Sequence, residues 1–67
     1  MGEEAILEEI NRLKIRLKEI VLEINGLKRQ LELSKISLDE FRGKKGLLET
    51  ELRGIIQRIT KIQGLRD

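Results

Sequence analysis

The stretch LSKISLDEFRGKKGLL, residues 33–48, decides the fold, because it separates two long runs of helical pattern. Within it, Ser37 is followed three residues later by Glu40, which is the spacing of a capping box at the start of a helix. Ile36 and Phe41 occupy the two positions of a hydrophobic staple around the same start. These signals coincide at one residue and predict that the chain reverses direction just before it.

The end of the preceding helix is less clearly marked. Glycine or asparagine usually takes the left-handed conformation after a helix, and here Ser34 stands at that position. A competing turn is GKKG, residues 43–46, whose two glycines each cost about 1 kcal/mol inside a helix. No N-cap side chain follows GKKG, so we favour the earlier turn. The prediction is a single helical hairpin with a helix at 3–33, a turn at 34–37 and a helix at 38–63.

A heptad seam runs through both predicted helices, with apolar residues at alternating spacings of three and four. Its phase is unbroken across the middle of the chain, where Ser34 and Lys45 are the polar exceptions. One continuous helix of about 60 residues, about 90 Å long, in a parallel coiled coil is therefore the alternative architecture. The seam residues that we expect at the helix contacts and the oligomer interface are Ile10, Leu13, Leu17, Ile20, Ile24, Leu27, Leu52, Ile55 and Ile59.

Large aliphatic residues also lie off the seam. Ile15 and Leu22, for example, are seven residues apart on the far side of the first helix. Helices with broad apolar arcs are usually buried on more than one side, and burying one large aliphatic side chain is worth about 1.5–3 kcal/mol. We expect self-association, most simply a dimer of hairpins forming a four-helix bundle. Two alternatives are a different helical partner and the ordinary scatter of aliphatic residues on a protein surface.

Composition limits the chemistry that this chain of 67 residues can perform. It contains no cysteine and no histidine, which excludes disulfides and the usual ligands of structural zinc. Carboxylates remain for acid–base catalysis, but paired acids such as Glu3 and Glu4 need a partly dry cleft that a hairpin lacks. We therefore expect no enzymatic activity, no metal site and no cofactor.

Hydrophobic patterning bears on location and source. No apolar run approaches the roughly 20 residues that span a bilayer, and the N-terminus opens with acids and not with the basic region of a secretory signal. We expect a cytoplasmic protein without a membrane span. Many Lys, Arg and Glu residues with a single Met and no Cys are typical of a heat-adapted source.

Nucleic-acid binding is the rival function. Six basic and three acidic residues lie between Gly26 and Gly46, and Arg42, Lys44 and Lys45 are the candidate contacts near the turn. A dimer would double this positive charge at one end, where it could contact a phosphate backbone. The net charge of only +2 and the acids within the same region favour a solvated surface instead.

Residues 34–49, SKISLDEFRGKKGLLE, resemble the helix–turn–helix of the short C-terminal (SHOCT) domain family. That family's pattern has a small residue, an aliphatic, a Ser or Thr cap, acidic residues, a phenylalanine, then lysine and leucine. Ser34 stands where the family usually has glycine. The resemblance implies a helical hairpin with a binding or assembly role and no catalytic residues. The matching positions are Ile36, Ser37, Glu40, Phe41, Lys45 and Leu48. Pattern and resemblance together predict an assembly or adaptor module.

Overall fold

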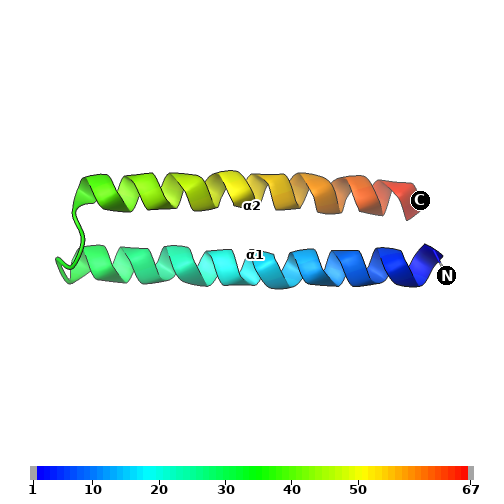
Figure 1. Cartoon of the computed structure of the whole chain (residues 1–67), viewed down its shortest axis with the longest axis horizontal. Coiled ribbons are helices and arrows are strands. Elements are labelled where there is room, and N and C mark those ends of the chain that lie inside the picture. The colour runs from blue at the N-terminus through cyan, green and yellow to red at the C-terminus, as the bar shows by residue number, and fades with distance from the viewer. Residues whose placement is uncertain (1, 67) are drawn as a thin grey trace.

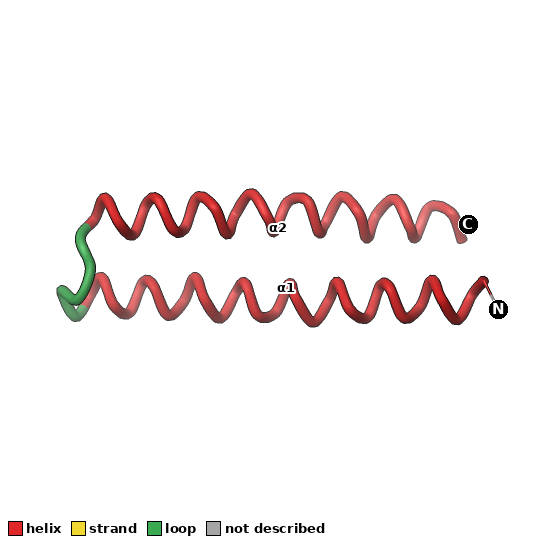
Figure 2. The backbone as a smooth tube through the Cα atoms, in the orientation of Figure 1, coloured by secondary structure: helices red, strands yellow, loops and turns green. Residues whose placement is uncertain are grey.

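The computed structural model describes residues 2–66 as two long antiparallel helices. Helix α1 (Gly2–Glu32) and helix α2 (Leu38–Arg66) lie side by side, joined by a short connection, with both chain ends at the same end of the molecule (Figure 1). The hairpin is 50 Å long and 15 Å by 12 Å across. Figure 2 shows that the connection is the one non-helical segment between the two helices.

The predicted hairpin is confirmed, and the alternative of one continuous helix is wrong. A rod of about 60 residues would measure about 90 Å, nearly twice the longest dimension observed. The helix predicted to end at residue 63 continues to Arg66, and the first helix is shifted by one residue at each end.

The first half of the reversal is a helix C-terminus closed by Ser34. Its φ of 59° makes it the one non-glycine residue with a left-handed backbone among residues 2–66. The Lys35 amide donates to the Gln30 carbonyl at 2.8 Å, and the Ser34 amide donates to the Leu31 carbonyl at 3.0 Å. These two bonds are those of a Schellman motif, which satisfies carbonyls that the end of a helix leaves unpaired. The serine thus takes the conformation that glycine usually provides.

The second half of the reversal is the N-cap of α2 at Ser37. Its hydroxyl oxygen accepts a hydrogen bond from the Glu40 amide at 3.1 Å, as the capping box predicts. A capping box also predicts that the Glu40 carboxylate accepts a hydrogen bond from the Ser37 amide. This second bond is not formed, because the Glu40 carboxylate pairs instead with Lys44 at 3.3 Å, one turn further along α2. Ile36 and Phe41 are half-buried, whereas the residues between them are exposed, as a hydrophobic staple requires.

The core is a thin line of aliphatic side chains between the helices. Three residues are buried, namely Ile10, Ile20 and Ile55, and the other seam residues of the predicted contact are half-buried. Leu38, which continues the seam at the start of α2, is 49% exposed because it lies beside the open end of the connection. Glycine does not shape the packing, since a Cβ added at any of the six glycines would meet nothing within 4 Å.

Replacing Ser34 with glycine should stabilise the hairpin. A Cβ in the left-handed region costs about 1–2 kcal/mol, and part of that cost is offset by the greater freedom of glycine in the unfolded chain. We expect Ser34→Gly to raise the free energy of unfolding by up to about 1 kcal/mol in urea titrations at fixed protein concentration. Ser34→Ala keeps the Cβ and is the control; equal stability of the two variants would contradict the assignment.

Removing the N-cap hydroxyl should destabilise the hairpin. Ser37→Ala leaves the Glu40 amide without its side-chain acceptor, and we expect a loss of about 1 kcal/mol in the free energy of unfolding. Glu40→Ala is the matched variant, since it removes only an exposed ion pair and should cost less. A larger loss in Glu40→Ala than in Ser37→Ala would show that the carboxylate, and not the hydroxyl, starts the helix.

Candidate functional site

The candidate site is an exposed apolar surface. The predicted interface residues form two sets, one between the helices and one on the outside of α1. The seam residues lie between α1 and α2, where they already contact each other within one chain and are buried or half-buried. Ile15 and Leu22 lie on the outside of α1 and are 60% and 70% exposed. The structure therefore leaves the second set available to a partner.

The exposed set extends beyond these two residues. All eight large aliphatic residues that lie off the seam are more than 40% exposed, as is Leu38, against three hydrophobic residues that are buried. Another twelve large hydrophobic residues are half-buried, so the single chain leaves nine of its large apolar side chains largely in water. The exposed members are Leu7, Ile15, Val21, Leu22, Leu33, Leu38, Leu47, Ile56 and Leu65.

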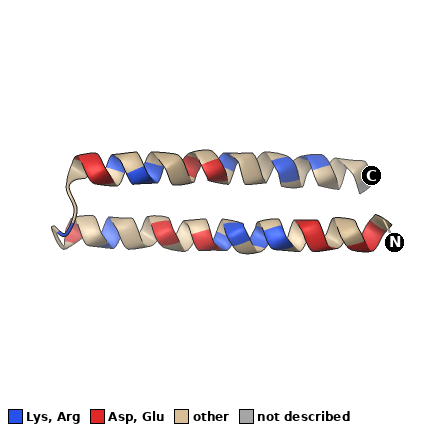
Figure 3. Ribbon diagram, in the orientation of Figure 1, with Lys and Arg blue, Asp and Glu red and all other residues tan. Residues whose placement is uncertain are grey.

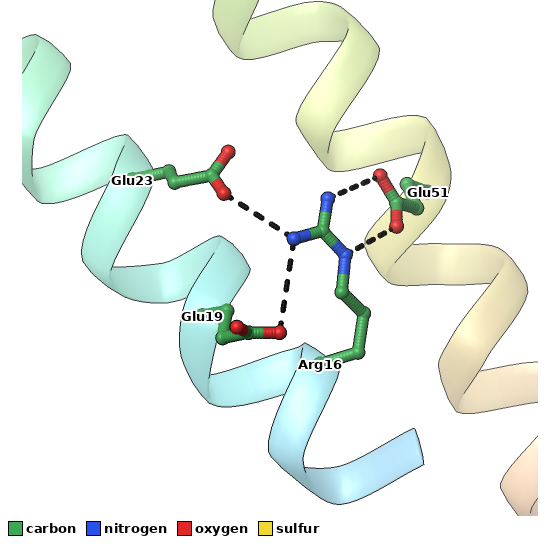
Figure 4. A network of polar contacts seen from close by, with 4 residues as sticks. All are labelled: Arg16, Glu19, Glu23 and Glu51. Atoms are coloured by element: carbon green, nitrogen blue, oxygen red, sulfur yellow. Dashed lines mark hydrogen bonds and ion pairs between the residues drawn. The ribbon is translucent and has the colours of Figure 1, made fainter. Parts of the chain in front are cut away.

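An ion-pair ladder covers one edge of the contact between the helices, and the Arg16–Glu51 pair within it was not predicted from the sequence. Arg16 of α1 reaches across to Glu51 of α2, donating from Nε at 2.6 Å and from a terminal nitrogen at 2.9 Å (Figure 4). The same guanidinium lies 3.2 Å from Glu23 and 3.9 Å from Glu19. Arg58 of α2 pairs with Glu9 of α1 at 3.2 Å.

The two pairs between the helices fix the register of the hairpin. Glu9 and Arg16 are seven residues apart on α1, and their partners Arg58 and Glu51 are seven residues apart on α2 in the opposite direction. The signs alternate along both edges, so a slip of one heptad would place like charges opposite each other. This alternation, next to the seam at intervals of seven, is the sequence signal that could have revealed the ladder.

Arg16 and Glu51 each stabilise the charged form of the other. The hydrogen bonds from Arg16 lower the pKa of the Glu51 carboxyl, and the Coulombic attraction of the guanidinium acts in the same direction. The hydrogen bonds to Glu51 raise the pKa of Arg16 above its already high ordinary value. Both side chains remain in contact with solvent, so the pair specifies the register more than it adds stability.

Further along the same edge, the ladder borders an open groove of about 390 Å³ near the turn. Its apolar part is formed by Leu27, Leu47 and Leu48, and Leu47 is 75% exposed. The groove is open along the side of the hairpin and could cover only part of a small ligand, whereas small-molecule sites usually bury most of the ligand. It therefore suits another side chain better than a substrate. The remaining lining residues are Glu23, Gly26, Gln30 and Lys44.

The basic residues proposed for nucleic acid are only partly available. Lys44 is paired with Glu40, and the Lys45 ammonium lies 5.6 Å from the centre of the Phe41 ring, where a cation–π contact holds it. Arg42 is exposed. Figure 3 shows acidic residues among the basic ones along α1 and the first half of α2, where the candidate contacts lie, whereas only Lys and Arg are coloured along the rest of α2.

Residues 2–66 contain neither a metal-ligand cluster nor a membrane-spanning helix. No group of three or more His, Cys, Asp or Glu residues within residues 2–66 is arranged to hold a metal ion. Neither helix, over the residues that the structure describes, is long and apolar enough to cross a membrane. No protein-family model, curated protein or solved structure matches this chain.

The Arg16–Glu51 pair should make stability depend on pH in acid. The lowered pKa of Glu51 means that its contribution is fully present above the ordinary value of 4.5 and is lost as pH falls through the folded-state value. We expect Glu51→Gln to be less stable than the parent chain at pH 7, with the difference shrinking below pH 4.5. Urea titrations at pH 7 and pH 3 measure this difference.

Glu49→Gln is the control for this prediction. Glu49 lies two residues away on α2 and forms no ion pair within residues 2–66. A difference between Glu51→Gln and the parent chain that stays constant from pH 7 to pH 3 would show that the pair does not carry the effect.

Proposed function

We propose that this chain is a non-enzymatic assembly module, in which two hairpins associate through their outer apolar surfaces into a four-helix bundle. The observation that carries the proposal is the set of nine large aliphatic residues that stay more than 40% exposed, beside three that are buried and eleven that are half-buried. Because each such residue is worth about 1.5–3 kcal/mol when buried, association would add to the margin of stability of a small domain.

The surface area supports the same conclusion. The accessible surface is 5411 Å², whereas a compact monomer of 7.8 kDa is expected to expose about 4,400 Å². The excess of roughly 1,000 Å² is similar to the roughly 800 Å² that each partner buries in a standard protein interface. A second hairpin could cover such an area along the 50 Å length of the helices.

The surroundings of the paired acids at the start of α1 favour assembly over catalysis. Glu4 and Glu8 are exposed, and Glu9 pairs with Arg58. Such carboxylates lack the partly desolvated surroundings that general acid–base catalysis requires. The partial resemblance of residues 34–49 to SHOCT hairpins is in keeping with an assembly role.

The mass of the purified chain in solution distinguishes self-association from binding to a different helical protein, because no other protein is present. We expect sedimentation to give about twice 7.8 kDa for the parent chain. The variant Ile15→Glu with Leu22→Glu should remain helical by circular dichroism but sediment as a single chain, because charge is placed in the apolar contact.

A matched control lies on the other helix. Thr50 and Gln57 are exposed on the outside of α2 with the same spacing of seven, so Thr50→Glu with Gln57→Glu adds the same charge to a polar face. This control should keep the double mass. A parent chain that sediments as a monomer would overturn self-association, and an unchanged mass for the Ile15 and Leu22 variant would remove these residues from the interface.

A further inference from the structure

The outer side of α1 carries four residues at intervals of seven, in the order acid, apolar, apolar, base. They are Glu8, Ile15, Leu22 and Arg29, and all four are exposed. Ile15 lies five residues from each of the buried residues Ile10 and Ile20, which places it about 140° around the helix from both. These four residues, which we term the outer stripe, therefore run along the side of α1 that faces away from α2.

The outer stripe is complementary to itself when a second copy lies antiparallel. A twofold axis between Lys18 and Glu19 places Glu8 opposite Arg29 of the second copy, and Ile15 opposite Leu22 of the second copy. Lys18 and Glu19 flank the outer stripe on its two sides, where the twofold axis places each beside its own copy, so the charge complementarity rests on the Glu8–Arg29 pairs. In a parallel pairing, Glu8 would face its own copy and Arg29 would face its own copy, and both like-charge contacts oppose association.

The charges at the ends of the outer stripe are free to make these contacts. Neither Glu8 nor Arg29 forms a side-chain ion pair or hydrogen bond within residues 2–66. The corresponding outer positions of α2 are Gly43, Thr50, Gln57 and Gly64, which offer no large apolar side chain. The partner that fits the outer stripe of α1 is therefore another α1.

We propose that two copies of this chain associate through α1 alone at the centre, with the outer stripes antiparallel about a twofold axis between residues 18 and 19. This inference rests on the proposed self-association and adds the face, the orientation and the register. Because the side of α1 that faces away from α2 meets its own copy, the four helices lie in a row, which replaces the closed four-helix bundle.

Disulfide cross-linking tests the register directly, because the parent chain contains no cysteine. Glu8→Cys and Arg29→Cys are prepared separately, mixed to allow subunit exchange, and oxidised in a glutathione buffer. A disulfide requires Cα atoms within about 7 Å. The antiparallel register brings position 8 of one copy to position 29 of the other, so the mixture should give a covalent dimer on a non-reducing gel.

Each variant alone should remain uncross-linked. Equivalent positions at 8 lie about 31 Å apart in the antiparallel register, from 21 residues at 1.5 Å each. Thr50→Cys on the outside of α2 is the control for chance collisions and should not cross-link with either variant. Cross-linking of Glu8→Cys with itself would indicate a parallel pair and overturn the proposal.

Two further outcomes separate this proposal from the proposed function. If the variants sediment at twice the chain mass but neither they nor their mixture cross-link, the copies associate through another face and this register is wrong. If the parent chain sediments as a monomer, both proposals are wrong.

Charge reversal gives an independent measurement that requires no new covalent bond. Glu8→Arg alone and Arg29→Glu alone each place two like-charge contacts in the antiparallel dimer, and we expect each to raise Kd roughly fivefold at low salt. The double variant exchanges the two charges and should return Kd to the parent value. In a parallel dimer neither single change would alter the like-charge contacts, so failure of the double variant to restore Kd would overturn the antiparallel register.

Discussion

The structure depends on one backbone constraint, the left-handed conformation of Ser34. A helix that continued through this residue would carry the unbroken heptad phase onward as a rod. Instead, the amides of Ser34 and Lys35 donate hydrogen bonds to carbonyls in the last turn of α1. Three residues after Ser34, the Ser37 hydroxyl oxygen accepts a hydrogen bond from an amide at the start of α2. Local hydrogen bonds therefore satisfy carbonyls at the end of α1 and an amide at the start of α2, which stabilises the reversal in addition to the thin core.

The length of the connection sets the register of α1 against α2. It places residues of α1 and α2 opposite each other in a fixed register, and that register converts charges that alternate along the sequence into ion pairs across the helices. Arg16 with Glu51 and Glu9 with Arg58 are members of this ladder. The exposed charges favour the register that the connection sets, because a slipped register would bring like charges together.

Local chemistry explains why much of the fold could be predicted from the sequence. The position of the turn follows from Ser37, Ile36 and Phe41, and each acts within one helical turn of the reversal. The predicted bond between the Glu40 carboxylate and the Ser37 amide is not formed, because Lys44 lies one turn from Glu40 and pairs with its carboxylate. The Arg16–Glu51 pair joins residues 35 apart, and it could be found only after the loop geometry had fixed which residues face each other. The exposed state of Ile15 and Leu22 followed from periodicity, but a single chain contains no contact that identifies their partner.

The difference between the two outer faces bears on whether assembly would stop at a dimer. Two apolar outer faces that fitted one another would allow each hairpin to contact a neighbour on both sides, and such head-to-tail contacts extend into filaments unless the rotation closes. Here the positions of α2 that correspond to the outer stripe carry glycine, threonine and glutamine, whereas Leu47, Ile56 and Leu65 are exposed elsewhere on α2. The outer stripe of α1 is complementary to itself. An isologous contact uses the same surface on both copies, so it leaves no second outer stripe for a third hairpin. The order of two charges and two aliphatic residues on one helix can therefore select both the orientation and the size of the assembly.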